Sequence, residues 1–281
     1  MALEPMLSFK YNLSICAILK NEGEYLAEWI EFHRIVGVEK FYIYDNESSD
    51  NTKDVLAPYI KSGIVEYTYW PGWGQQGAAY NDCIAKHKFD TKWLAIIDLD
   101  EFIVPVATKT VPELLDNLGD LAGLEIKWTT YGSSGHKTKT EGLVIERFKY
   151  HAAADFARDA LVKSIVNPRL IVDVGAHRHV YLSGRVVNGY GHKVGGAFKN
   201  NLLVRLGIIK HKEEKAYDAI RINHYAVKSW EEYVARRTRG DNDAINGAKY
   251  NKEYFDLCNR NEVHDLIMDK YIEQIKKRLG V

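Results

Sequence analysis

The stretch at 93–103 constrains this chain most, because an apolar run rich in β-forming residues ends there in carboxylates. The apolar part is typical of a strand that is buried on both faces of a sheet. Core packing gives no reason for the acids that follow, Asp98, Asp100 and Glu101. On an extended chain Asp98 and Asp100 point the same way, because they are two residues apart. Such a pair can hold Mg²⁺ or Mn²⁺, and it equally fits a solvated acidic turn.

Strand and helix patterns alternate up to this stretch. Apolar runs predict strands at 13–19, 40–44 and 64–69. Helices are predicted at 24–36 and 76–88, and between them a third helix follows the turn at 45–50 and ends at residue 59. The stretch at 93–103 supplies the fourth strand. The alternation favours an α/β fold with a mostly parallel sheet and helices on both faces. In open sheets of this kind, ligands bind at the carboxyl ends of the strands, which is where the acids lie.

After residue 104 the alternation weakens. The pattern predicts a helix at 111–118, a strand at 123–128, short strands between glycine-rich turns over 141–200, and a last strand at 220–225. Ser229 and Glu232 match a capping box for a helix that runs through Arg239, and residues 263–279 are amphipathic. No repeat or low-complexity linker divides the chain, so we expect a single domain over residues 1–281.

Composition excludes several classes of protein. Lys and Arg together number 38, as do Asp and Glu, so no global field attracts nucleic acid. The three cysteines are scattered, which favours a reducing compartment over a disulfide framework or a zinc site. The sequence shows no signal-peptide pattern and no run approaching the ~20 apolar residues that span a membrane. We therefore expect a cytoplasmic globular protein.

Several short segments, taken in their order, resemble family 92 glycosyltransferases and their bacterial relatives. They are CAILKNE at 16–22, EWIEFH at 28–33, YIYDN at 42–46, IDLDEF at 97–102, YGSSGH at 131–136, KSIV at 163–166 and NHY at 223–225. The similarity runs from about residue 13 to about residue 239. Each segment alone is weakly specific, and their number and order carry the resemblance.

The resemblance implies a GT-A fold and transfer of a sugar, most often galactose, from a UDP-sugar with inversion of the anomeric centre. It implies a divalent metal, usually Mn²⁺, under the donor diphosphate. The bacterial relatives act in the cytoplasm, in surface-polysaccharide or lipopolysaccharide assembly. On this basis residues 10–105 form a nucleotide-binding half, 106–240 complete the metal and acceptor sites, and 241–281 form a helical extension.

A metal acting as a Lewis acid would stabilise the charge that develops on departing UDP. We expect Asp100 to bind it directly, and Asp98 to bind it through water or to hold the ribose. His224 ends a strand before a capped helix and is the expected third ligand, since neutral imidazole suits Mn²⁺; a core histidine is the alternative. Lys228 faces either phosphate oxygens or solvent.

The resemblance places further candidates around the donor. Residues at the uridine and ribose are Ala17, Lys20, Glu22, Asp45 and Asp82, and possible donor contacts are Gln76 and Asn81. Asp45 is the strongest of these, because it directly follows the second strand. A plain turn over 45–50 and a polar helix face at 76–82 are the alternatives.

An inverting transfer also needs a base that takes the proton of the acceptor hydroxyl. The sequence leaves three candidates open, which are Glu101, Asp155 and Asp241. An acceptor platform or ordinary packing would explain Trp128, Tyr131 and His136 equally well. The basic run Lys276, Lys277 and Arg278 either touches an anionic membrane surface near a lipid-linked acceptor or is a solvated helix end.

Three other functions stay open at this point. The chain could transfer glucose or a uronic acid from UDP, or it could bind a nucleotide or sugar without turnover. A metal-dependent phosphotransferase or nuclease could use the same acids, but the sequence has no Gly-x-x-x-x-Gly-Lys loop and no further acid cluster.

Overall fold

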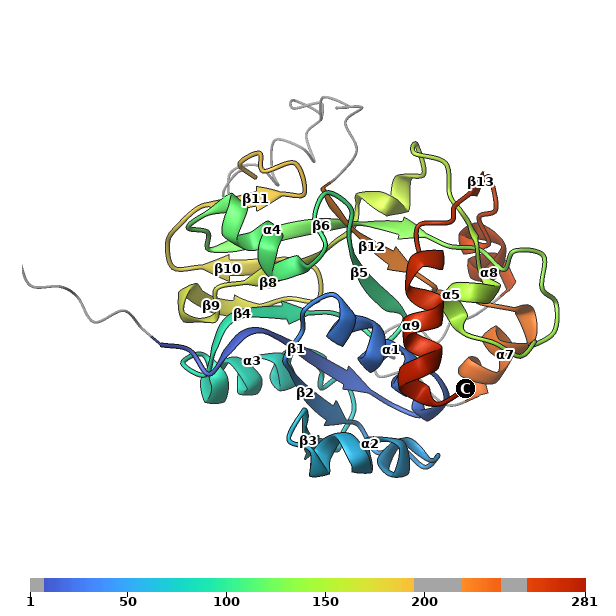
Figure 1. Cartoon of the computed structure of the whole chain (residues 1–281), viewed down its shortest axis with the longest axis horizontal. Helices are drawn as coiled ribbons and strands as arrows, with labels where there is room; N and C mark the ends of the chain where they lie inside the picture. The colour runs from blue at the N-terminus through green and yellow to red at the C-terminus, as the bar shows by residue number, and fades with distance from the viewer. Residues whose placement is uncertain (1–7, 195–218, 239–251) are drawn as a thin grey trace, which may run out of the picture.

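The computed structural model describes residues 8–194, 219–238 and 252–281. Its main sheet contains β1 (Tyr11–Leu19), β2 (Lys40–Asp45), β3 (Val65–Tyr69), β4 (Thr91–Ile96), β5 (Glu101–Pro105), β6 (Gly123–Thr130), β8 (Val162–Val166), β11 (Val186–Asn188) and β12 (Ile220–His224). The strand order is β3-β2-β1-β4-β8-β6-β12-β5, and β11 also pairs with β6 (Figure 1). Two small ladders pair β7 (Tyr150–His151) with β13 (Val263–His264), and β9 (Ile171–Val174) with β10 (His179–Tyr181).

The first half of the sheet, β3-β2-β1-β4, is entirely parallel. Its connections are α1 (Gly23–Ile35), α2 (Thr52–Lys61) and α3 (Gln76–His87), as the alternating pattern predicted. Every residue of β2 is buried, because this strand has β1 and β3 beside it and side-chain layers on both faces. The parallel strands place their carboxyl ends at one edge of the sheet.

The second half, β8-β6-β12-β5, is mixed. β8 runs antiparallel to both β4 and β6, while β12 is parallel to β6 and antiparallel to β5. The expectation that the acids continue an extended strand is wrong. β4 ends at Ile96, and the N–H of Glu101 donates to the backbone oxygen of Asp98 at 3.2 Å, which closes a turn before β5 begins. The two aspartates therefore need not point the same way.

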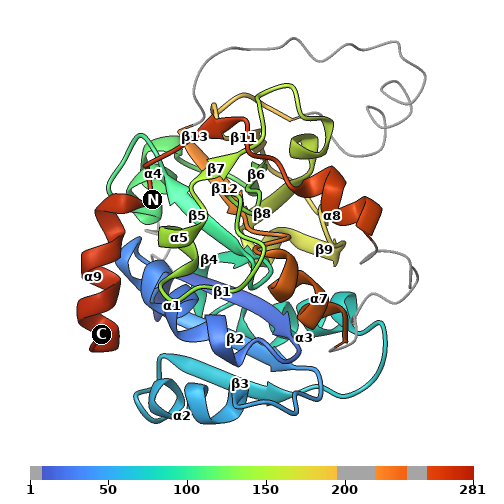
Figure 2. The ribbon, with the colours of Figure 1, turned by 90° about the vertical axis from the view of Figure 1, so that its right-hand side faces the viewer.

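Helices cover both faces of the sheet, which confirms the expected α/β arrangement. α1 and α9 (Asp269–Leu279) lie on one side and α3 lies on the other (Figure 2). The larger apolar core lies on the side of α1 and includes Trp29 and Phe32, together with residues of α4 (Val111–Leu118). The smaller core lies under α3 and includes Tyr80 and Leu94. The acid turn is held between these two cores.

The capping box predicted after the last strand is present. The N–H of Glu232 donates to Ser229 Oγ at 3.2 Å, and the N–H of Ser229 donates to Glu232 Oε2 at 3.2 Å. The cap begins α7 (Trp230–Thr238). Four shorter helices complete the described fold: α5 (Val144–Arg147), α8 (Lys252–Cys258), η1 (Ala157–Ala160) and η2 (Pro168–Leu170). Over the residues the structure describes, every helix is too short or too polar to cross a membrane.

Candidate metal and donor site

Three buried side chains meet where β5 and β12 lie side by side. Glu101, the first residue of β5, lies directly across from His224, the last residue of β12. The preceding Asp100 is tied to the same place, because its backbone oxygen accepts from the N–H of Tyr225 at 2.8 Å. Asp100, Glu101 and His224 each offer one ligand atom, and these atoms all lie within 4.8 Å of one another. We call these three residues the metal cluster.

The chemistry of the metal cluster fits a divalent cation. Two carboxylates and one imidazole form a set that Mn²⁺ accepts. Glu101 Oε1 and His224 Nδ1 are both buried and have no hydrogen-bond partner in the described part of the chain. Buried polar atoms are rarely left without partners. A bound ligand could supply the partner that these two atoms lack. His224 Nε2 lies 3.6 Å from Asp100 Oδ2.

Two of the three predicted metal ligands, Asp100 and His224, belong to this cluster, but Asp98 does not. Asp98 Oδ2 lies 2.7 Å from Lys163 Nζ on β8. Asp98 Oδ1 accepts from Gln76 Nε2 at 3.1 Å and from the Tyr80 hydroxyl at 3.2 Å, both on α3. These bonds hold Asp98 beside the cluster, and they bring the predicted donor contact Gln76 to the same place.

Lys163 is the most unusual residue that the sequence analysis did not select. Its side chain is 2 % exposed although it carries an ammonium group. Its Nζ also lies 3.7 Å from Glu101 Oε2. Burial disfavours the charged amine, but Asp98 and Glu101 outweigh burial and raise the pKa of Lys163 above its ordinary value. A lysine between the buried strand residues Val162 and Ser164 was the signal that could have identified it.

The pKa values of the two acids of the metal cluster are shifted in opposite directions. Burial opposes ionisation of Asp100, but Arg236 and His224 outweigh it and hold the pKa of Asp100 well below its usual range. Burial raises the pKa of Glu101 well above its usual range, although Lys163 opposes this. A bound dication would favour the ionised form of Glu101 as well.

Arg236 on α7 is a second cation that the sequence analysis missed. Its Nη1 lies 2.6 Å from Asp100 Oδ2, and its Nε lies 3.7 Å from Glu22 Oε1. The guanidinium therefore links the predicted donor residue Glu22 to the metal cluster. Only the tertiary structure reveals this, because α7 follows β4 by more than a hundred residues in the sequence.

Lys228 lies in the turn between β12 and α7, and it is 5 % exposed. Its φ of 54° places it in the left-handed region, which a side-chain-bearing residue adopts only at a cost of roughly 1 kcal/mol. Its Nζ lies 4.3 Å from the centre of the Tyr25 ring. Burial lowers the pKa of Lys228, although Glu22 and Asp100 oppose this. The strained turn therefore directs an ammonium group inward, towards the acids.

The remaining donor candidates divide into two groups. Lys20 directly follows β1, and Asp45 is the last residue of β2. Both residues therefore lie along the same sheet edge as the acid turn. Asp45 accepts from the Ser48 N–H at 2.9 Å and from the Tyr67 hydroxyl at 2.7 Å, so it also organises its own turn.

The second group is bonded within the fold. Ala17 is fully buried in the larger core. Asn81 donates to the backbone oxygen of Gly77 at 3.0 Å, and Asp82 accepts from the Tyr44 hydroxyl at 2.8 Å and lies 2.7 Å from Lys86 Nζ. This placement does not support side-chain contacts between these three residues and a donor.

The acceptor candidates are mostly packed against protein. The Trp128 ring centre lies 4.1 Å from that of His224, so Trp128 backs the metal cluster. Tyr131 is 1 % exposed and donates to Asp265 Oδ2 at 2.9 Å, which does not support a stacking platform. His136 is half-buried, and its Nε2 lies 3.2 Å from the backbone oxygen of Arg147.

The three candidates for the catalytic base lie in different environments. Glu101 is fully buried, and its Oε2 accepts from the Asp98 N–H at 2.9 Å, so this acid is poorly placed to meet an acceptor. Asp155 is exposed in the segment before η1. Asp241 lies outside the described residues.

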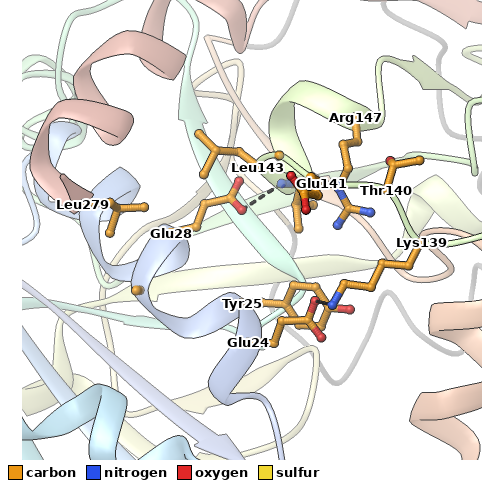
Figure 3. Close-up of a pocket in the computed structure, with 12 residues that line it drawn as sticks. Glu24, Tyr25, Glu28, Lys139, Thr140, Glu141, Leu143, Arg147 and Leu279 are labelled. Carbon is orange, nitrogen blue, oxygen red and sulfur yellow. Dashed lines mark hydrogen bonds and ion pairs between the residues drawn. The ribbon is translucent and has the colours of Figure 1, made fainter. Parts of the chain in front are cut away.

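A cavity of about 320 Å³, lined by both polar and apolar residues, lies between α1 and the segment at 139–147 (Figure 3). Glu28 on its wall accepts from the N–H groups of Val144 at 2.8 Å and Ile145 at 3.0 Å. Burial raises the pKa of Glu28 to about 7, although these two bonds oppose it. Arg147, also on the wall, lies 2.8 Å from Glu232 of α7. This ion pair connects the cavity wall to α7, the helix that carries Arg236.

Comparisons with known proteins give this site a context. The profile of glycosyltransferase family 92 matches residues 11–261. A family 92 protein of Oryza sativa subsp. japonica is 28% identical over 184 residues, which are 63% of this chain and 31% of that protein. A β-1,4-galactosyltransferase of Caenorhabditis elegans is 25% identical over 187 residues, 60% of this chain and 43% of that protein. The matched regions thus span less than half the length of these relatives.

The chain is also similar to solved structures. The glucosyl-3-phosphoglycerate synthase of Mycobacterium tuberculosis, crystallised with Mn²⁺, UDP and glucosyl-3-phosphoglycerate, aligns with 72% of this chain and 82% of its own. The sequence identity is 13% and the TM-score is 0.34.

Proposed function

The chain belongs to glycosyltransferase family 92, and from this premise we propose that it is a metal-dependent, inverting glycosyltransferase of the GT-A class. The donor is a UDP-sugar, with UDP-galactose the first choice because one relative is a β-1,4-galactosyltransferase. The acceptor is a glycan or a glycolipid. The observation that carries the proposal is the metal cluster of Asp100, Glu101 and His224 at the carboxyl end of β4, where ligands of α/β sheets bind.

The residues of the metal cluster would hold Mn²⁺ or Mg²⁺, and the bound cation would supply Lewis-acid stabilisation of the departing diphosphate. Around the cluster, Lys163, Lys228 and Arg236 bring three positive charges. Arg236 and Lys228 are suited to phosphate oxygens, because charge-assisted hydrogen bonds are stronger than neutral ones. Burial opposes ionisation of Asp98, but Lys163 outweighs burial and lowers the pKa of Asp98. Lys163, Gln76 and Tyr80 already donate to its two oxygens.

The proposed setting is surface-polysaccharide or lipopolysaccharide assembly at the cytoplasmic face of a membrane. The basic end of α9 gives this setting limited support. Lys276 Nζ lies 2.8 Å from Glu146, and Arg278 Nη1 lies 3.2 Å from Glu31. Two of the three basic residues are therefore paired within the chain.

An assay of UDP release and sugar transfer tests the proposal. The purified protein is incubated with UDP-galactose, UDP-glucose and UDP-glucuronic acid, each with Mn²⁺, with Mg²⁺ or with EDTA, and with a panel of saccharide acceptors. We expect turnover that requires the metal and is fastest with UDP-galactose. Calorimetry that shows UDP binding without any turnover would favour a non-catalytic binding protein instead.

A variant links this activity to the cluster. Asp100→Asn should lower transfer by roughly 10²–10³-fold, because the charge that holds the cation is lost. Asp54→Asn, at an exposed acid of α2, is the matched control and should leave the rate unchanged. An Asp100→Asn protein with wild-type activity would reject the metal role of the cluster.

A further inference from the structure

The short helix η1 brings Asp159, an acid that the sequence gave no reason to select, close to the metal cluster. Asp159 Oδ1 accepts two hydrogen bonds from Thr130, one from its N–H at 3.0 Å and one from its hydroxyl at 2.6 Å. Thr130 ends β6, and its register partner on β12 is His224. Register partners on neighbouring strands present their side chains on the same face. The carboxylate of Asp159 is therefore fixed beside the imidazole of the metal cluster.

Neighbouring carboxylates are already committed to other groups. Asp98 is bonded to Lys163, Asp100 is bonded to Arg236, and Glu101 is fully buried. Asp159 differs because its side chain is half-buried and both of its hydrogen bonds fall on one oxygen. Its Oδ2 accepts no hydrogen bond from the residues that the structure describes. Both oxygens of Asp98 accept hydrogen bonds, and Asp100 and Glu101 belong to the metal cluster. Among these four acids, Asp159 is therefore the one whose unbonded oxygen is not assigned to the cation.

We propose that Asp159 is the general base that takes the proton from the acceptor hydroxyl, an assignment that rests on the proposed function. The acceptor oxygen forms its bond to the anomeric carbon as its proton passes to Asp159 Oδ2. The bond between that carbon and the diphosphate oxygen breaks, and its electron pair leaves with UDP. Thr130 holds Oδ1 and thereby aims the opposite oxygen away from β6.

The environment of Asp159 suits this role. Burial raises the pKa of Asp159 although the two bonds from Thr130 oppose it. A raised pKa makes a carboxylate a better proton acceptor. The competing explanation is a purely structural brace that fixes the end of β6. Asn at this position separates the two explanations, because its amide oxygen can accept both bonds from Thr130 but cannot accept a proton in the reaction.

The test compares Asp159→Asn with Asp54→Asn, at an exposed acid of α2. For Asp159→Asn we expect kcat for sugar transfer to fall roughly 10²–10⁴-fold. The Kd for UDP with Mn²⁺, measured by calorimetry, and the Tm should stay close to wild type. Asp54→Asn should transfer sugar at the wild-type rate. Transfer by Asp159→Asn within about tenfold of wild type would overturn the assignment.

A second variant covers the case in which Asp159→Asn does not fold. Asp159→Ala leaves space for a small carboxylate, so added formate should restore part of the transfer rate. A folded Asp159→Ala protein that formate does not rescue would count against the proposal. Failure of the proposed function itself has a different signature, since the wild-type protein would then neither transfer sugar nor bind UDP with Mn²⁺.

Discussion

The two halves of the central sheet are built in different ways. In β3-β2-β1-β4, all strands are parallel, and strands that follow one another in the sequence lie next to or near one another in the sheet. The helices that join them are already indicated by the hydrophobic pattern. In β8-β6-β12-β5, strands from distant parts of the chain pair, and β12 lies between β6 and β5. The first half fixes where the acid turn lies, and the second half gives the turn its partners. The chemistry of this protein therefore depends on the half that local pattern describes least well.

The largest expected effect tests whether the second half supports the acid turn. Lys163→Met leaves the half-buried Asp98 and the buried Glu101 without their cation, so the free energy of unfolding should fall by about 3 kcal/mol. Urea unfolding followed by circular dichroism measures it. Lys127→Met, at an exposed lysine of β6, should change stability by less than about 0.5 kcal/mol. Equal effects of the two substitutions would show that the buried pairing is not needed.

The pH dependence of stability tests the contact between α1 in the first half and α5, which follows the acid turn in the sequence. The pKa of Glu28 is raised to about 7 in the fold, so its contribution to stability is complete below its unfolded pKa and is lost as pH rises through 7. The loss amounts to at most ~3 kcal/mol. Thermal unfolding should therefore show Glu28→Gln gaining stability relative to wild type between pH 5 and pH 8. Glu24→Gln, at an exposed site, should show no such trend.

Arg236→Gln asks whether α7 competes with the metal for Asp100. The guanidinium 2.6 Å from Asp100 Oδ2 repels a cation at the metal cluster, so its removal should tighten binding of Mn²⁺ alone. We expect a gain of roughly tenfold, or about 1.4 kcal/mol, by calorimetry without nucleotide. Arg34→Gln, whose arginine pairs with Glu31, is the control and should leave the affinity unchanged. Unchanged or weaker binding by Arg236→Gln would contradict the idea.

The smallest effect is expected in the first half. Ile43→Val removes one methylene from a fully buried residue of β2 and should cost about 1 kcal/mol of unfolding free energy. The rate of sugar transfer at 25 °C should not change, because the site residues keep their positions. A large loss of transfer rate with this small loss of stability would mean that the two halves are more tightly coupled than their construction suggests.

Much of the fold was predictable, and the reason is local. The first three strands, the helices between them and the cap at Ser229 all lie within one residue or a few residues of their expected bounds. Apolar periodicity and helix caps depend on residues that are close in the sequence, so they can be identified from the sequence alone. The position of His224 at the end of a strand was also predictable from the sequence, whereas Asp100 lies in the turn between β4 and β5.

Other features required the three-dimensional pairing. Asp98 and Asp100 looked like a matched pair on an extended strand, but a turn separates their environments. Lys163 on β8 and Arg236 on α7 reach the acids, and Asp159 on η1 reaches Thr130. The distances between these residues in the sequence give no hint of contact. A pairing between distant strands is set by the whole packed core, which no local pattern encodes.

The sequence by itself determined the α/β class, the family resemblance and the presence of carboxylates at a strand end, because these depend on residue order and on short-range periodicity. The tertiary structure decided which acids share a site and which cations balance them. Within the described residues, it also decided which carboxylates keep an oxygen without a hydrogen bond. These properties arise from burial and from register between strands that meet only after folding, and both set the charge state of each acid.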